Sequence, residues 1–242
     1  MTQGLPRTRF NSAGLVRLLA ELAVAEVADT KQDFAARLSE WLDLKDALAL
    51  YSALNSAAAR PAARAMPAAL LSAELARLRA TLGAAVTAGP GLPTPLPNAT
   101  PEEAADFAPF HRHYLAQQRA MAAAISPLRA AVRTALGRQS AALGQLAALD
   151  AVMEQALAAR EASLLATVPV LLGRRFAHLL EAHRRAREAA QPDDPGQWMQ
   201  AGGWLARFCA DLQRVLLAEL DLRLLPVAGL LAALDKDSTE LQ

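Results

Sequence analysis

The feature that most constrains this chain is an apolar residue at every third or fourth position along most of its length. Between residues 15 and 22, four leucines share one face of a helix, whereas Arg17 and Glu21 lie on the opposite face. No alternating β pattern and no internal repeat occurs in the sequence. Hydrophobic residues make up 53% of the chain and aromatic residues only 5%, so the apolar mass is mainly Ala and Leu, which are strong helix formers. The sequence therefore predicts an all-α fold, a multi-helix bundle of long amphipathic helices.

A segment rich in proline and glycine interrupts this pattern between residues 83 and 101. It contains five prolines and three glycines, which remove amide donors and disfavour a helix. We expect a proline-rich linker at 83–101, between an N-terminal helical unit, 1–82, and a C-terminal helical bundle, 102–242. The alternative is that the segment lies as a belt on the surface of one domain in which both units pack together.

Capping residues and prolines set the expected bounds of the helices. Ser, Thr, Asn and Asp side chains accept hydrogen bonds from the free N–H groups of a first helical turn, and Thr30 with Asp33 resembles a capping box. Pro226 should break or kink the last long helix. The expected helices run from Asn11 or Ser12 to Ala28, from Thr30 to about Trp41, from Asp43 to about Leu54, from Pro67 to Gly83, over 107–125, 127–136, 140–166 and 168–189, and from Trp198 to Leu225.

The run 215–234 is apolar around most of its helical circumference. A helix of this kind is either central in a bundle or pressed between subunits. Central burial is the favoured interpretation, and a homo-oligomer interface through 215–234 is the alternative. Glu219, Asp221 and Arg223 argue against a membrane span in this run, and we expect no direct membrane insertion.

Three residues are candidates for an interaction site on separate helices. Glu26 falls on the apolar face of the first helix, where it marks either a partner-facing or catalytic carboxylate or the edge of the core. Trp41 belongs to the apolar face of the second helix. His111 flanks the apolar stripe of 107–125, and His113 points about 200° away from it on the same helix, so the two cannot hold a metal from one face. We expect His111 to be a hydrogen-bonded histidine at the core edge.

An arginine-rich segment, 174–187, is the candidate contact for nucleic acid. A local surplus of cations suits phosphate groups, and the candidate side chains are Arg174, Arg184, Arg185 and Arg187. However, Glu181 and Arg185 at i,i+4 are also the pairing of an ordinary solvated helix. No aromatic residue interleaves with the arginines on the polar side, so nucleic-acid binding is the alternative interpretation and not the leading one.

The chain carries no recognisable catalytic motif. It has no phosphate-binding glycine loop, no nucleophile elbow and no set of residues at zinc-binding spacing. We therefore assign no catalytic, cofactor-binding or metal-binding residue and expect no enzyme and no cofactor. The single cysteine, Cys209, lies in line with Leu205 and Leu212, which indicates a buried, inert thiol and fits a reducing cytoplasm. The formal charge of +1 gives no global attraction to nucleic acid or to membranes, and the N-terminus lacks the features of a signal peptide.

Three segments resemble a bacterial family of uncharacterised proteins, the domain-of-unknown-function family DUF3348. They are "LVRLLAELAVAEVADTKQDFAARLSEWLDLKDALAL" at 15–50, "FHRHYLAQQRAM" at 110–121 and "LAALDAVMEQALAAREASLLATVPVLLGRRF" at 146–176. The resemblance implies no catalytic residue, and it implies a cytoplasmic accessory of a membrane-associated assembly. We therefore expect a cytoplasmic helical protein-interaction or scaffold protein with an unknown protein partner. Nucleic-acid binding through 174–187 is the alternative.

Overall fold

The computed structural model describes residues 14–22, 40–55, 66–88, 92–94, 100–187 and 193–240. Within these ranges every regular element is a helix and no strand occurs, which confirms the predicted all-α fold. The helices are α1 (Gly14–Glu21), α3 (Leu44–Asn55), α4 (Ala68–Thr87), α5 (Pro101–Ala104), α6 (Ala108–Gln139), α7 (Ala141–Leu165), α8 (Thr167–Ala186), α9 (Pro195–Trp198) and α10 (Trp204–Glu240).

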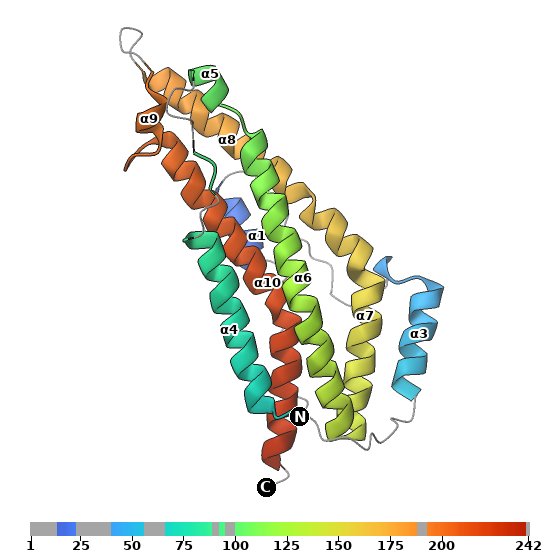
Figure 1. The fold of residues 1–242 in the computed structure, drawn as a ribbon. Helices are drawn as coiled ribbons and strands as arrows, with labels where there is room; N and C mark the ends of the chain where they lie inside the picture. The colour runs from blue at the N-terminus through green and yellow to red at the C-terminus, as the bar shows by residue number, and fades with distance from the viewer. Residues whose placement is uncertain are drawn as a thin grey trace, which may run out of the picture.

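The C-terminal helix, α10, is the centre of the bundle. It packs against α1, α4, α6, α7 and α8, and Figure 1 shows α4 and α6 running along it. Its inward side chains are fully buried, with no exposed surface at Leu205, Phe208, Leu212, Val215, Leu216 and Val227. The apolar run 215–234 therefore packs inside the bundle, as the central-burial interpretation predicts. Leu225, which is 61% exposed, is its large outward-facing apolar side chain.

Helices from both sides of the proline-rich segment contribute to one hydrophobic core. The four leucines of α1 and of the residue directly after it are all buried, as the helical periodicity predicts. Among the described residues up to the end of α4, the buried ones are Leu15, Leu18, Leu19, Leu22, Ala53, Leu71, Leu82 and Val86. Except for Ala53, they belong to the same cluster as the buried residues of α6, α8 and α10. Whether 1–82 and 102–242 would fold as separate units stays a prediction.

The helix breaks that we expected between residues 125 and 127 and at Pro226 are wrong, whereas the alternative of a kink at Pro226 stays a prediction. α6 continues through Pro127 and joins the predicted helices 107–125 and 127–136, and α10 continues through Pro226. A proline inside a helix removes one hydrogen bond and costs about 3 kcal/mol. Large side chains on both sides of Pro127, such as Ile125 and Leu128, are buried, and each contributes about 1.5–3 kcal/mol. Packing therefore outweighs the local cost of the proline.

The end of α4 also differs from the expectation. This helix reaches Thr87, four residues beyond Gly83, so the first part of the predicted linker is helical. Its last turn packs on α10, because Val86 is only 2% exposed and its carbonyl oxygen accepts a hydrogen bond from Gln213 Nε2 at 3.1 Å. This contact satisfies a carbonyl group that a helix end leaves without an intrahelical donor.

The predicted N-terminal cap of α3 is confirmed. Asp43 Oδ1 accepts a hydrogen bond from the Asp46 amide at 2.8 Å, and Asp46 Oδ2 accepts one from the Asp43 amide at 3.3 Å. This reciprocal pair satisfies two free donors of the first turn. The expected caps at Asn11, Ser12 and Thr30 lie outside the described residues.

Candidate interaction surface

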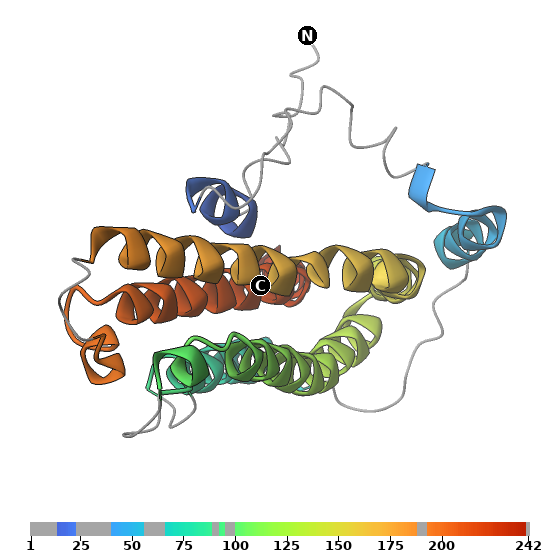
Figure 2. The same cartoon turned by 90° about the horizontal axis from the view of Figure 1, so that it is seen from above.

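Helix α3 lies at the outer edge of the molecule and packs on α7. Figure 1 and Figure 2 show it on the side of α7 that faces away from α10. Gln145 Nε2 of α7 donates a hydrogen bond to the Leu54 carbonyl oxygen at 3.2 Å. Before the other end of α3, the Arg160 guanidinium lies 5.3 Å from the centre of the Trp41 ring, a cation–π distance. These two contacts place α3 antiparallel to α7.

A second apolar face of α3 points away from α7. Ala53 is 7% exposed, on the face of α3 that packs on α7, whereas Leu44, Leu48 and Tyr51 are 77%, 60% and 68% exposed. These three residues, which we call the α3 stripe, are spaced at i, i+4 and i+7 and so share one side of the helix. Leu54, which is 53% exposed, lies beside them. Contiguous exposed apolar surface of this kind is typical of an interaction site.

The structure separates the interaction residues that the sequence singled out. Trp41 is half-buried beside Arg160, next to the N-terminal end of α3. His111 is exposed on α6, where its ring centre lies 6.0 Å from that of Phe107. Glu26 lies outside the described residues. Sequence reasoning missed the α3 stripe, because periodicity identifies an apolar face without showing whether another helix covers it.

The arginine-rich segment contains two exposed arginines and two that pair with carboxylates of the described residues. Arg174 and Arg184 are exposed. Arg185 Nε donates to Glu181 Oε1 at 3.0 Å, which is the i,i+4 pair that the sequence predicted. Arg187, which directly follows α8, pairs with the carboxylate of Asp193. Two of the four candidate guanidinium groups are thus paired, and the positive field available to a phosphate is reduced.

A pocket of about 490 Å³ lies where α8 meets α9 and the start of α10. Asp193 on its wall accepts a hydrogen bond from Trp198 Nε1 at 2.9 Å, contacts His183 Nε2 at 3.1 Å and pairs with Arg187 at 2.9 Å. Burial opposes the ionisation of Asp193, but the hydrogen bonds from His183 and Trp198 outweigh it and hold the pKa of Asp193 below its ordinary value. The carboxylate thus joins the segment before α9 to α8. The helical periodicity of the sequence offered no signal for this contact.

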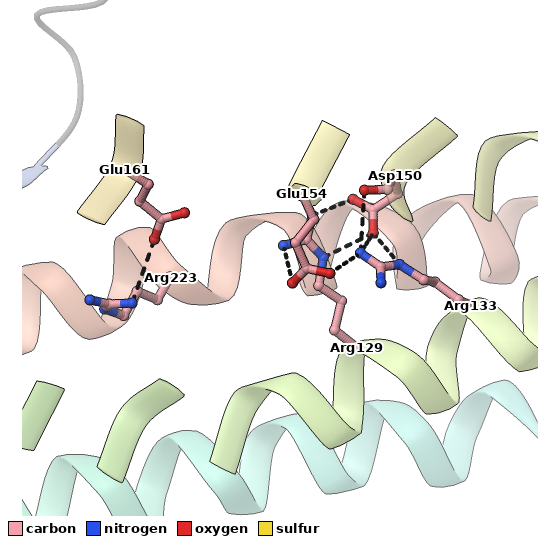
Figure 3. A network of polar contacts seen from close by, with 6 residues as sticks. All are labelled: Arg129, Arg133, Asp150, Glu154, Glu161 and Arg223. Atoms are coloured by element: carbon pink, nitrogen blue, oxygen red, sulfur yellow. Dashed lines mark hydrogen bonds and ion pairs between the residues drawn. The ribbon is translucent and has the colours of Figure 1, made fainter. Parts of the chain in front are cut away.

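The only fully buried carboxylate of the described residues is Glu219, which has no exposed surface. It accepts hydrogen bonds from the Tyr114 hydroxyl group, from Gln118 Nε2 at 3.0 Å and from Arg223 at 2.8 Å. Burial and the negative charge of Glu219 raise the pKa of Tyr114, so its hydroxyl group remains a donor. Arg223 also contacts Glu161 of α7 at 3.5 Å (Figure 3). This cluster compensates a buried charge and connects α6, α7 and α10.

A second polar cluster, shown in Figure 3, holds α7 on α6. Asp150 accepts hydrogen bonds from Arg129 Nε at 2.9 Å and from Arg133 Nε at 2.7 Å, and Glu154 accepts one from Arg133 at 2.6 Å. Burial opposes the ionisation of Asp150, but the hydrogen bonds from both arginines outweigh it and lower its pKa. Because α3 rests on α7, this cluster also determines where the α3 stripe lies.

The described residues contain no group of three or more His, Cys, Asp or Glu side chains placed to hold a metal ion. Cys209 is buried, with its Sγ 3.9 Å from Met199 Sδ. Burial raises the pKa of the Cys209 thiol to about 11, so the thiol is neutral at physiological pH and a poor nucleophile.

Within the part of the chain that the structure describes, one stretch, Ala141–Ala186, is long and apolar enough to cross a membrane by length and composition alone. A mostly buried core helix of a soluble protein can meet the same criterion, but only 22% of this stretch's most apolar window is buried in the structure. The expectation of no direct membrane insertion stays a prediction.

These features define an all-helical bundle protein that exposes an apolar helix face at its outer edge. The family model described as a protein of unknown function, DUF3348, matches residues 1–236. The chain therefore belongs to this family, as the resemblance of its three segments indicated. No curated protein and no solved structure matches the chain significantly.

Proposed function

We propose that this protein is a helical interaction or scaffold protein that binds another polypeptide on the α3 stripe. The observation that carries the proposal is the exposure of Leu44, Leu48 and Tyr51 on a helix whose other face already packs on α7. Burial of each such side chain is worth about 1.5–3 kcal/mol. A partner that covers the stripe therefore gains binding free energy.

The support beneath the stripe favours the same function. Binding residues act best on rigid elements whose positions are held by further contacts. α7 is joined to α6 through Asp150 and Glu154 and to α10 through Glu161. Asp43 and Lys45 are exposed near the N-terminal end of the stripe, and a polar rim of this kind is usual around an apolar contact patch.

Nucleic-acid binding through 174–187 is less well supported. Arg174 and Arg184 are exposed, but Arg185 and Arg187 already pair with carboxylates. Two exposed cations release few counterions, so they contribute little affinity for a phosphate backbone.

We further propose that the protein acts in the cytoplasm and has no catalytic role. A single buried cysteine suits a reducing compartment. The same function accommodates a partner that belongs to a membrane-associated assembly, which is what the family resemblance implies.

A photo-crosslinking amino acid placed at position 48 in the native host tests this function. Its control is the same amino acid at position 225, because Leu225 is 61% exposed and Leu48 is 60% exposed. We expect discrete crosslinked products from position 48 and none from position 225. We also expect Leu44→Glu to abolish the products, because a charge in the contact is costly to desolvate.

Two results would contradict the proposed function. One is a lack of crosslinked polypeptide at position 48. The other is a set of products that is the same at positions 48 and 225, which would indicate random collisions.

A further inference from the structure

We infer that the polypeptide on the α3 stripe is a second copy of this chain, bound with the two α3 helices antiparallel in a weak two-fold dimer. This inference rests on the proposed function and names its partner. The sequence suggested 215–234 as the alternative homo-oligomer interface, but that run packs inside the bundle. The interface inferred here is instead α3, a helix at the edge of the molecule (Figure 2).

The spacing of the stripe predicts a single helix as its occupant. Leu44, Leu48 and Tyr51, followed by Asn55, are separated by four, three and four residues. These are alternate d and a positions of a heptad, which form a narrow seam that accepts one facing helix. A two-fold axis near the middle of α3 places Leu48 of each copy against Tyr51 of the other. Such an interface is self-complementary and closes at two subunits.

The residues that flank the seam are compatible with a self-pair. At the corresponding e and g positions stand Lys45, Ala47, Ser52 and Leu54. Charges at these positions normally select between partners and repel the wrong one. Here the flanks carry one charge and no acidic residue, so an antiparallel self-pair places Lys45 near Ser52 and Ala47 near Leu54 of the other copy and brings no like charges together.

The position of Lys45 determines the orientation. α3 has 12 residues, and Lys45 lies one residue from its start. In a parallel pair the two Lys45 ammonium groups lie side by side and repel each other. In an antiparallel pair each ammonium group lies beside the C-terminal turn of the other helix. Lys45 and Asn55 of one α3 are about 15 Å apart along the helix axis, so the two ammonium groups lie at opposite ends of the pair. The free carbonyl groups of that turn attract a cation.

The available area indicates weak association. Covering the α3 stripe and Leu54, which are 53–77% exposed, removes on the order of 300–400 Å² per copy. Stable interfaces bury about 800 Å² per partner. We therefore expect a micromolar or weaker dimer, whose population rises with protein concentration.

Sedimentation equilibrium of the purified full-length chain tests the dimer over about 1–500 µM, a range suited to weak association. We expect the average mass to rise from 25.7 kDa toward twice that value. Leu48→Glu and, separately, Leu44→Glu should keep the protein monomeric. Leu225→Glu is the matched control on α10, and it should dimerise as the unaltered chain does. Far-UV circular dichroism checks that each variant is folded.

Disulfide trapping tests the orientation. In the antiparallel pair, a mixture of Leu44→Cys and Asn55→Cys chains should form a crosslinked dimer, and Leu44→Cys alone should not. Self-crosslinking of Leu44→Cys would overturn the antiparallel arrangement. The native Cys209 is buried and does not compete.

The outcomes distinguish this inference from the proposed function. A monomer at every concentration, together with position-48 crosslinks to a different protein, overturns the self-partner and leaves the proposed function intact. A monomer with no crosslink at position 48 overturns both. Dimerisation that is unchanged in Leu48→Glu removes the stripe from the interface and overturns the inference. Binding to lipid vesicles that Leu48→Glu abolishes, without any dimer, identifies a membrane occupant and also overturns it.

Discussion

At the scale of single residues, the charges inside this bundle are satisfied by one another. Glu219 receives donors from α6 and from its own helix, and Asp150 receives two arginines from α6. A buried carboxylate without such partners would be costly. The sequence shows these residues as polar positions in apolar helices, but only the pairing explains why they are tolerated.

The first prediction concerns Asp150, whose side chain is 13% exposed. Asp150→Asn leaves the shape almost unchanged but removes the charge that Arg129 and Arg133 share. We expect a loss of about 2–4 kcal/mol in the free energy of unfolding, because two partly buried cations lose the more buried of their two shared carboxylates and keep only Glu154. Urea denaturation followed by circular dichroism measures it. Glu181→Ala breaks an exposed pair and should cost less than about 1 kcal/mol. Equal losses in both variants would contradict the argument.

The same variant should change how stability depends on pH. The pKa of Asp150 is lowered in the folded state from an ordinary value of 3.8. A lowered folded pKa contributes stability that is complete above the unfolded pKa and is lost as the pH falls through the folded pKa. The stability difference between the unaltered chain and Asp150→Asn should therefore be largest near neutral pH and shrink below about pH 4. Urea midpoints measured across this range test it, and a constant difference would refute it.

At the scale of the elements, capping was predictable and proline tolerance was not. The Asp43 cap of α3 depends on residues three positions apart, so the local sequence is sufficient to predict it. Pro127 in α6 looks like a break in the same local terms. The helix continues because Ile125 and Leu128 pack into a core built by other helices.

A pair of glycines tests element-level packing. A Cβ on Gly203 would lie 2.2 Å from the Trp198 carbonyl oxygen, in the turn that joins α9 to α10. Gly203→Ala should therefore lower the free energy of unfolding by at least about 2 kcal/mol. Gly137 in α6 has no atom within 4 Å of its Cβ position, and Gly137→Ala should gain about 0.5–1 kcal/mol. Thermal unfolding of both variants measures the contrast, and a stable Gly203→Ala protein would contradict it.

At the scale of the whole molecule, the helices before the proline-rich linker complete the core around α10. α1 and α4 both pack on α10, and α4 also packs on α6. Removing these helices exposes apolar surface on α6 and α10 that the remaining chain has no described helix to cover. The stability of 102–242 alone is therefore the direct test of the predicted division into two units.

We expect a fragment of residues 102–242 to lack a cooperative unfolding transition. The full chain buries seven large apolar side chains of α1, its last turn and α4 in the common core, worth on the order of 10 kcal/mol. That value is comparable to the whole stability of a typical domain. Near-UV circular dichroism and urea denaturation of the fragment measure it. If the fragment unfolds cooperatively at the urea midpoint of the full chain, then 102–242 is an independent unit.

The sequence by itself determined the helices and their inward faces. The leucines of α1 and the position of Cys209 follow from a periodicity of 3.6 residues, which is a local property. Only the tertiary structure decided which apolar faces are covered. The run 215–234 and the α3 stripe are both apolar, yet one is enclosed by five helices and the other is exposed. Coverage depends on packing between segments far apart in the chain, as with Tyr114 and Glu219, which are 105 residues apart, and no local pattern encodes that packing.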